Sequence, residues 1–188
     1  MYNKLLAGFL AVLITSTGHA STTLNQNSAN VPNQQNTDYV NLKEKLVGTW
    51  ILQSYVEIPI DGSAPFYPLG QKATGIIMYT PDGYMSAQLM GEKRTKFQSG
   101  DWFNGSDDEY IDEAKTYIAY SGRFFIDQQT KQLKHEMLVS LFPNWIGQQQ
   151  ERLVSLEGDL LKLGPASPIL SKGKRVMSQL VWKRAKEN

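Results

Sequence analysis

From about residue 46 onward, apolar and polar residues alternate with a period of two, the pattern of β-strands that bury one face. The first strand ends before Pro59 and carries Trp50, Leu52, Ser54 and Val56 on one face. Seven further strands are predicted, at residues 74–80, 84–90, 123–127, 133–142, 148–156, 160–163 and 175–184. Eight short antiparallel strands with tight connections predict an all-β fold, a closed barrel that leaves no sheet edge exposed.

One segment, residues 106–122, departs from this alternation. Ser106 and Glu109 have the spacing of a capping box, the reciprocal hydrogen-bonding pair of a helix N-terminus. The helical apolar stripe that follows consists of Tyr110, Ile111, Ala114, Tyr117 and Ile118. Gly122 is placed to end the helix. We expect this helix to be inserted between two strands and to cover one mouth of the barrel.

The first 37 residues predict two segments that precede the barrel. Lys4 and the ten apolar residues 5–14 have the form of a secretory signal, and the apolar run is shorter than the roughly 20 residues of a membrane span. We expect a signal peptide at residues 1–20, cleaved between Ala20 and Ser21, and a periplasmic or secreted protein. Residues 21–37 carry no charge and no aromatic side chain, which predicts a disordered polar linker.

The barrel domain is then expected at residues 38–185, opened by a short helix in which Tyr39, Leu42 and Leu46 fall at helical spacing. Without Lys4, the remaining 18 basic residues balance the 18 acidic ones. A neutral chain without basic clusters argues against nucleic acid and anionic membranes as partners. Because the chain has no cysteine, stability must come from one hydrophobic core and not from disulfides.

Several motifs resemble the bacterial and fungal lipocalin-like domain family over about residues 46–184. These motifs are Gly48-Thr49-Trp50 and the segments at residues 79–86, 140–145 and 180–182. The resemblance implies a calycin-type barrel, and it implies no single activity. It also implies that an arginine near the end of the last strand lies across Trp50 and closes the barrel floor. Arg184 is the best match by position, ahead of Lys183 and Arg175.

The residues available for chemistry are few. Once the signal is removed, His135 is the one histidine, and there is no thiol, so a zinc site of several His or Cys ligands and a Cys–His pair are excluded. No P-loop or dinucleotide-binding fingerprint is present. We therefore expect neither a metal nor a bound cofactor.

His135 and Arg152 are the strongest candidates for a binding site inside the barrel. His135 alternates with apolar residues along its strand, and Gln150 and Arg152 share a face of the next strand. An interior histidine and arginine in an apolar cavity suit a ligand with an apolar body and one polar or anionic end. The alternative is a structural one, a core histidine bonded to a tyrosine and an arginine paired with a carboxylate such as Glu136 or Glu151.

Four further residues are candidate ligand contacts. Tyr84 and Ser86 lie on one side of their strand, although its other side, with Met85, Ala87 and Leu89, is equally suited to face inward. Asn144 and Trp145 lie between two strands, where they would form a rim, Asn144 donating to a ligand and Trp145 covering it. The alternative for this pair is turn formation with aromatic packing.

The predicted function is binding of a small, largely apolar molecule in the barrel cavity of an exported protein. An alternative is a cofactor-independent isomerase, cyclase or hydratase, with His135 as general acid–base and Arg152 or Tyr84 steadying an oxyanion. A second alternative is a structural or partner-binding barrel with a filled core. An open cavity reached by His135 separates the first two from the third. The oligomeric state is not predicted.

Overall fold

The structure is a computed structural model that describes residues 42–127, 130 and 132–186. The predicted signal peptide and polar linker lie outside the described residues, as does Tyr39. Residues 42–46 are helical, which is the described part of the short helix expected before the barrel. Among the described residues, no helix is long and apolar enough to cross a membrane.

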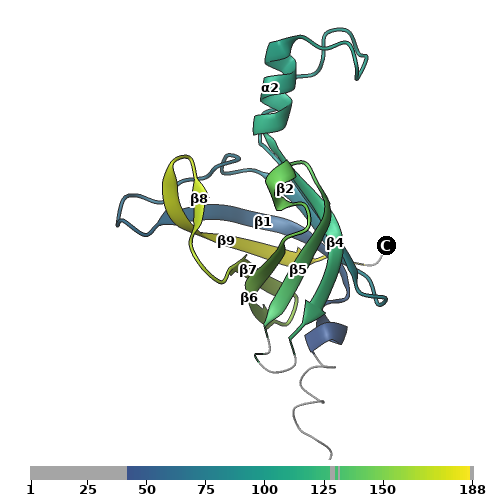
Figure 1. Cartoon of the computed structure of the whole chain (residues 1–188), viewed down its shortest axis with the longest axis vertical. Coiled ribbons are helices and arrows are strands. Elements are labelled where there is room, and N and C mark those ends of the chain that lie inside the picture. Colours follow the sequence, from purple (N-terminus) through teal and green to yellow (C-terminus); the bar gives the residue numbers. More distant parts are fainter. Residues whose placement is uncertain (1–41, 128–129, 131, 187–188) are drawn as a thin grey trace, which may run out of the picture. The chain divides into compact units, whose positions relative to one another are not determined.

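Eight antiparallel strands close into a barrel (Figure 1). The strands are β1 (Gly48–Pro59), β2 (Thr74–Tyr79), β3 (Tyr84–Met90), β4 (Tyr117–Ile126), β5 (Leu133–Ser140), β6 (Gln149–Glu157), β7 (Leu160–Pro165) and β9 (Lys174–Arg184). Each strand pairs with the next, and β9 pairs back with β1, from Trp50 opposite Arg184 to Pro59 opposite Val176. The predicted eight-stranded barrel is therefore confirmed. A short extra strand, β8 (Ile169–Ser171), pairs with the first residues of β9.

The inserted helix, α2 (Asp107–Lys115), begins where predicted, with the Ser106–Glu109 capping box formed. The prediction that it continues to Gly122 is wrong, because β4 already begins at Tyr117, which pairs with Met90 of β3. Gly122 instead lies in β4 at a β-bulge, where a Cβ atom would stand 1.8 Å from the Glu136 carbonyl oxygen. This glycine permits two strands to approach closely and does not end a helix.

The expectation that α2 covers a mouth of the barrel needs correction. No residue of the helix is buried, and it extends from one end of the barrel, opposite the end where helical residues 42–46 lie (Figure 1). The reason is the early helix end: Tyr117 and Ile118, which were to complete its apolar stripe, belong to β4. The shortened helix keeps too little apolar surface to pack across the opening.

At the other end, Trp50 and Arg184 close the barrel floor. Trp50 is fully buried, and its Nε1–H donates to the Leu46 carbonyl oxygen over 2.9 Å. The guanidinium carbon of Arg184 lies 4.0 Å from the centroid of the Trp50 ring, and Arg184 Nη1 donates to the Val47 carbonyl at 3.0 Å. Indole and guanidinium thus join the first and last strands to the segment that precedes the barrel.

A register shift in β1 changes which residues face the interior. Between Leu52 and Ser54 the pairing of β1 with β9 is displaced by one residue. The predicted inward positions Ser54 and Val56 are therefore wrong, because an extra residue in one strand reverses the alternation beyond it. Tyr55 and Glu57 are buried in their place.

Candidate ligand-binding site

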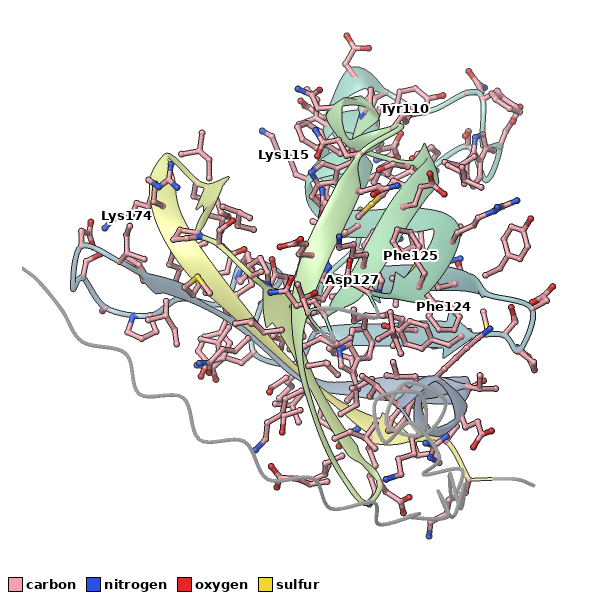
Figure 2. The ribbon with its side chains drawn as sticks, turned by 60° about the horizontal axis from the view of Figure 1, so that its bottom comes forward. Tyr110, Lys115, Phe124, Phe125, Asp127 and Lys174 are labelled. Atoms are coloured by element: carbon pink, nitrogen blue, oxygen red, sulfur yellow. The ribbon has the colours of Figure 1, made fainter. Side chains whose placement is uncertain are left out.

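The barrel interior contains a cavity of about 400 Å³, so the alternative of a filled core is wrong. This inner cavity is lined mainly by apolar side chains, among them Leu89, Leu180 and Trp182. A second space of about 410 Å³, the outer pocket, shares Tyr55 and Trp145 with it and reaches the end of α2. Figure 2 labels Lys115 on α2 and Lys174 at the start of β9, the two elements that flank this end.

His135 lies in the cavity wall with only 1% of its surface exposed. Arg152 Nε donates to its Nδ1 atom at 3.4 Å, so the ring proton resides on Nε2, which lies 3.0 Å from the Tyr79 hydroxyl oxygen and donates to it. Burial, and then the nearby Arg152 charge, hold the pKa of His135 well below its ordinary value. His135 is therefore neutral near pH 7, and both of its ring nitrogens are engaged by protein groups.

Arg152 brings a positive charge to the inner cavity. Besides its bond to His135, its Nη2 donates to Gln150 Oε1 at 2.6 Å, and both side chains line the cavity. Among the residues that the structure describes, no ion pair involves Arg152; Glu151 pairs with Lys134 at 3.6 Å instead. The alternative in which Glu136 or Glu151 neutralises this arginine is thus wrong, and its charge remains available to a ligand.

Asn144 and Trp145 lie at the rim of the inner cavity, on the 3₁₀ helix η1 (Pro143–Trp145). The Trp145 ring packs edge-on against Tyr120 and Phe142, with ring centroids 5.6 Å apart in both pairs. The Asn144 carbonyl accepts a hydrogen bond from Gln148. The structure therefore brings five of the seven candidate ligand contacts, His135, Gln150, Arg152, Asn144 and Trp145, to one cavity.

The other two candidates, Tyr84 and Ser86, do not line this cavity, and their placement as interior contacts is wrong. Met85, Ala87 and Leu89 form the buried side of β3, so Tyr84 and Ser86 face outward. On that outer side Tyr84 stacks near Arg123, and Ser121 donates to the Ser86 hydroxyl oxygen at 2.7 Å. The side with larger apolar side chains is turned inward because it fills the core.

A second polar cluster, on β1 and β9, was not predicted from the sequence. The Tyr55 hydroxyl donates to Glu57 Oε1 at 2.5 Å, and Glu57, 1% exposed, stands opposite Ser178 in the strand register. Burial, followed by this hydrogen bond, raises the pKa of Tyr55 well above its ordinary value. The signal in the sequence was a glutamate, directly before Ile58 and Pro59, in a strand that is otherwise rich in apolar residues. Its inward direction could not be predicted, because the bulge at residues 52–54 reverses the alternation of the strand.

Three buried side-chain atoms have no hydrogen-bond partner among the described residues: Glu57 Oε2, Ser178 Oγ and Trp182 Nε1. All three belong to β1 or β9, and Ser178 and Trp182 line the inner cavity whereas Glu57 lines the outer pocket. Within the same described residues, no group of three or more His, Cys, Asp or Glu side chains could hold a metal ion. The inner cavity thus contributes one cation, and the outer pocket contributes one carboxyl group together with the side chains of Lys115 and Lys172.

Two comparisons show which known proteins this chain resembles in sequence. The sequence pattern of the lipocalin-like domain family matches residues 47–185, most of the chain. The chain is also similar to the 4'-hydroxy-3'-methoxypropiophenone carrier protein ppsC of Aspergillus oryzae, with 35% identity over 106 residues. This match covers 53% of the present chain and 96% of the relative.

Proposed function

Since this chain belongs to the lipocalin-like domain family, we propose that it is a carrier whose inner cavity reversibly holds a small, largely apolar molecule bearing an electron-rich oxygen. The observation that carries the proposal is Arg152, a partly buried cation in an apolar cavity with no carboxylate partner among the described residues. Taking a charge out of water is costly unless it is paired. A ligand carbonyl, carboxylate or phenolate oxygen supplies such a partner.

The surroundings of Arg152 favour binding over catalysis. Neutral His135 accepts a hydrogen bond from the arginine and so orients the guanidinium without adding a competing charge. Because Tyr79 and Arg152 occupy both ring nitrogens, His135 has no nitrogen free to exchange a proton with a ligand. His135 is thus a positioning residue in this proposal, and the isomerase, cyclase or hydratase alternative gains no support from the geometry.

The size of the site and the relative agree with such a ligand. A cavity of about 400 Å³ lies within the range of about 300–1,000 Å³ typical of small-molecule sites. The name of the Aspergillus relative states that it carries an aromatic ketone with a hydroxyl and a methoxy substituent. We propose an oxygen-substituted aromatic molecule as the ligand class here, with its acceptor oxygen at Arg152 and its ring among the apolar side chains.

Calorimetric titration with 4'-hydroxy-3'-methoxypropiophenone tests this proposal, together with the fluorescence of Trp145 and Trp182, which line the cavity. We expect saturable binding with quenching of tryptophan emission. Arg152→Met should weaken binding about 10- to 100-fold, since a hydrogen bond to a charged group contributes about 1.5–3 kcal/mol. Arg123→Met is the matched control, because Arg123 is exposed beside Tyr84. Equal affinity of both variants, or no binding of any aromatic ketone, would overturn the proposal.

Export is a second part of the proposal. It rests on the signal-like residues 1–20, and it would place the carrier in the periplasm or outside the cell. A cavity that releases its ligand reversibly suits the transfer of poorly soluble molecules through an aqueous compartment. The N-terminus of the mature protein provides the measurement.

A further inference from the structure

We propose that Glu57, with Ser178 opposite it, forms a second polar subsite that accepts a hydroxyl group of the ligand, so that the ligand is held at two ends. This inference rests on the proposed carrier function and specifies its ligand class. One end presents an acceptor oxygen to Arg152, and the other presents a hydroxyl donor to Glu57. The preferred ligand is then a compact aromatic molecule with a hydroxyl group and a carbonyl or carboxylate on opposite sides of its ring.

Only one of the two oxygens of the Glu57 carboxyl group accepts a hydrogen bond. Oε1 accepts the Tyr55 hydroxyl at 2.5 Å, whereas Oε2 is buried with no hydrogen-bond partner among the described residues. A buried acceptor left without a donor loses its hydration and receives nothing in return. A ligand hydroxyl at Oε2 removes this loss, which makes the unpaired oxygen a source of selectivity for donors.

Ser178 adds a second unpaired atom at the same level of the barrel. Its backbone stands opposite Glu57 in the β1–β9 register, and its side chain lies close enough to the Tyr55 hydroxyl to oppose the rise in the pKa of Tyr55. Its Oγ atom is buried and has no hydrogen bond of regular geometry among the described residues. A serine hydroxyl both donates and accepts, so it can bind the oxygen of a ligand hydroxyl whose proton points at Glu57. Two adjacent unpaired groups of complementary type indicate a site for one hydroxyl group.

The subsite adjoins the cavity that contains Arg152. Tyr55 lines both the outer pocket, where Glu57 lies, and the inner cavity, where Ser178 and Arg152 lie. Strands β7 and β9 separate β6, which carries Arg152, from β1, which carries Glu57. Three strand spacings of about 4.8 Å put the backbones of Arg152 and Glu57 about 14 Å apart along the barrel wall. The distance between their polar groups is shorter, because both side chains reach into the barrel. An aromatic ring with an oxygen at each end fits such a span.

A matched pair of probes tests the inference, 4'-hydroxypropiophenone and propiophenone, which differ by one hydroxyl group. We expect the wild-type chain to bind the hydroxylated probe about tenfold or more tightly, because a site built to hydrogen-bond a hydroxyl rejects the analogue that lacks it. Glu57→Gln should reduce this preference to less than about threefold, with the larger loss of affinity for the hydroxylated probe. Arg152→Met should weaken both probes by a similar factor.

Two further variants separate the subsite from a structural role of Glu57. Ser178→Ala should lower the preference for the hydroxylated probe, and Tyr55→Phe, which leaves the carboxyl group in place, should retain it. A hydroxyl preference that is absent, or that persists in both Glu57→Gln and Ser178→Ala, would overturn the subsite and leave the carrier proposal standing, because propiophenone still binds. If neither probe binds the wild-type chain, the carrier proposal fails and the subsite fails with it.

Discussion

The Nε atom of Arg152 lies 3.4 Å from Nδ1 of His135, so a neutral, buried histidine is the hydrogen-bond acceptor that orients the cavity's arginine. By sequence alone the two residues were equivalent candidates for ligand binding. In the proposed carrier their contact gives them different roles: Arg152 faces the ligand, and His135 holds Arg152 in place with Tyr79 behind it. Burial, and then the adjacent positive charge of Arg152, lower the pKa of this histidine and keep it uncharged.

This division of roles predicts unequal effects on affinity. Arg152→Met should weaken binding of 4'-hydroxy-3'-methoxypropiophenone about 10- to 100-fold, whereas His135→Gln should weaken it by less than about fivefold, since glutamine can still accept from the guanidinium. Calorimetric titration of both variants measures this. If the chain instead converted a ligand, and His135→Gln lowered turnover about 10²- to 10⁴-fold, the enzyme alternative would be correct.

The buried histidine should also make stability depend on pH. Burial, and then Arg152, hold the pKa of folded His135 well below its ordinary value of 6.5. Below about pH 6.5 the unfolded chain binds a proton at this histidine that the folded chain does not. The contribution of neutral His135 to the free energy of unfolding is therefore complete only above that pH. It falls as the pH drops, by up to about 1.4 kcal/mol per pH unit, until the folded pKa is reached.

Urea unfolding between pH 7.5 and 5.0 measures this dependence, a window above the range in which carboxyl groups titrate. His135→Gln is the matched control, since it removes the titrating group and keeps a polar side chain of similar size. Its free energy of unfolding should change far less over the same window. An equal slope in both proteins would assign the pH dependence to groups other than His135.

Closure of the barrel floor should be sensitive to Trp50 and less so to Arg184. Trp50→Ala should lower the free energy of unfolding by about 3–5 kcal/mol, the usual cost of truncating a buried large aromatic side chain. Arg184→Met should cost about 0.5–2 kcal/mol, because it removes the cation over the indole ring and keeps an apolar stem. Chemical denaturation with a slope unchanged from the wild type gives both values. A loss below about 1 kcal/mol for Trp50→Ala would contradict its place in the floor.

Gly122 should tolerate no side chain, for steric reasons alone. A Cβ atom there would meet the Glu136 carbonyl oxygen at 1.8 Å, which forces β4 and β5 apart at their bulge. We expect Gly122→Ala to lower the thermal midpoint severely or to prevent folding. Gly62→Ala is the control: no atom lies within 4 Å of its Cβ position, and only its φ of +80° is unfavourable. The free energy of unfolding of Gly62→Ala should fall by about 1 kcal/mol. A similar loss in Gly122→Ala would contradict the close approach of the Glu136 carbonyl to Gly122.

Export can be tested directly. Protein recovered from the periplasm or medium of its host should begin at Ser21 or within a few residues of it, as determined by N-terminal sequencing or intact mass. Deleting residues 1–20 should retain the protein in the cytoplasm with its barrel intact. Full-length protein in the cytoplasm of wild-type cells would contradict the proposed signal.

Much of the architecture follows from local patterns in the sequence. The period of two in the strands and the Ser106–Glu109 capping box are decided within a few residues, and the structure has the barrel and the start of α2 where predicted. The inward direction of His135 follows in the same way, because it lies between two buried apolar neighbours, Leu133 and Met137, with no bulge intervening. Local alternation is reliable wherever strand pairing remains regular.

An alternating pattern does not say which face of a strand points inward, or where a bulge interrupts the strand. Tertiary structure decided both. Both faces of β3 alternate equally well, and only packing against the core turned Leu89 inward and Tyr84 outward. One extra residue in β1 reversed the faces and brought Glu57 inside, and pairing with β3 drew Tyr117 out of the predicted helix. The sequence by itself thus determined a barrel with His135 in its wall. The register between distant strands determined the cavity and its second polar cluster, because a strand's inner face is set by the partners it pairs with.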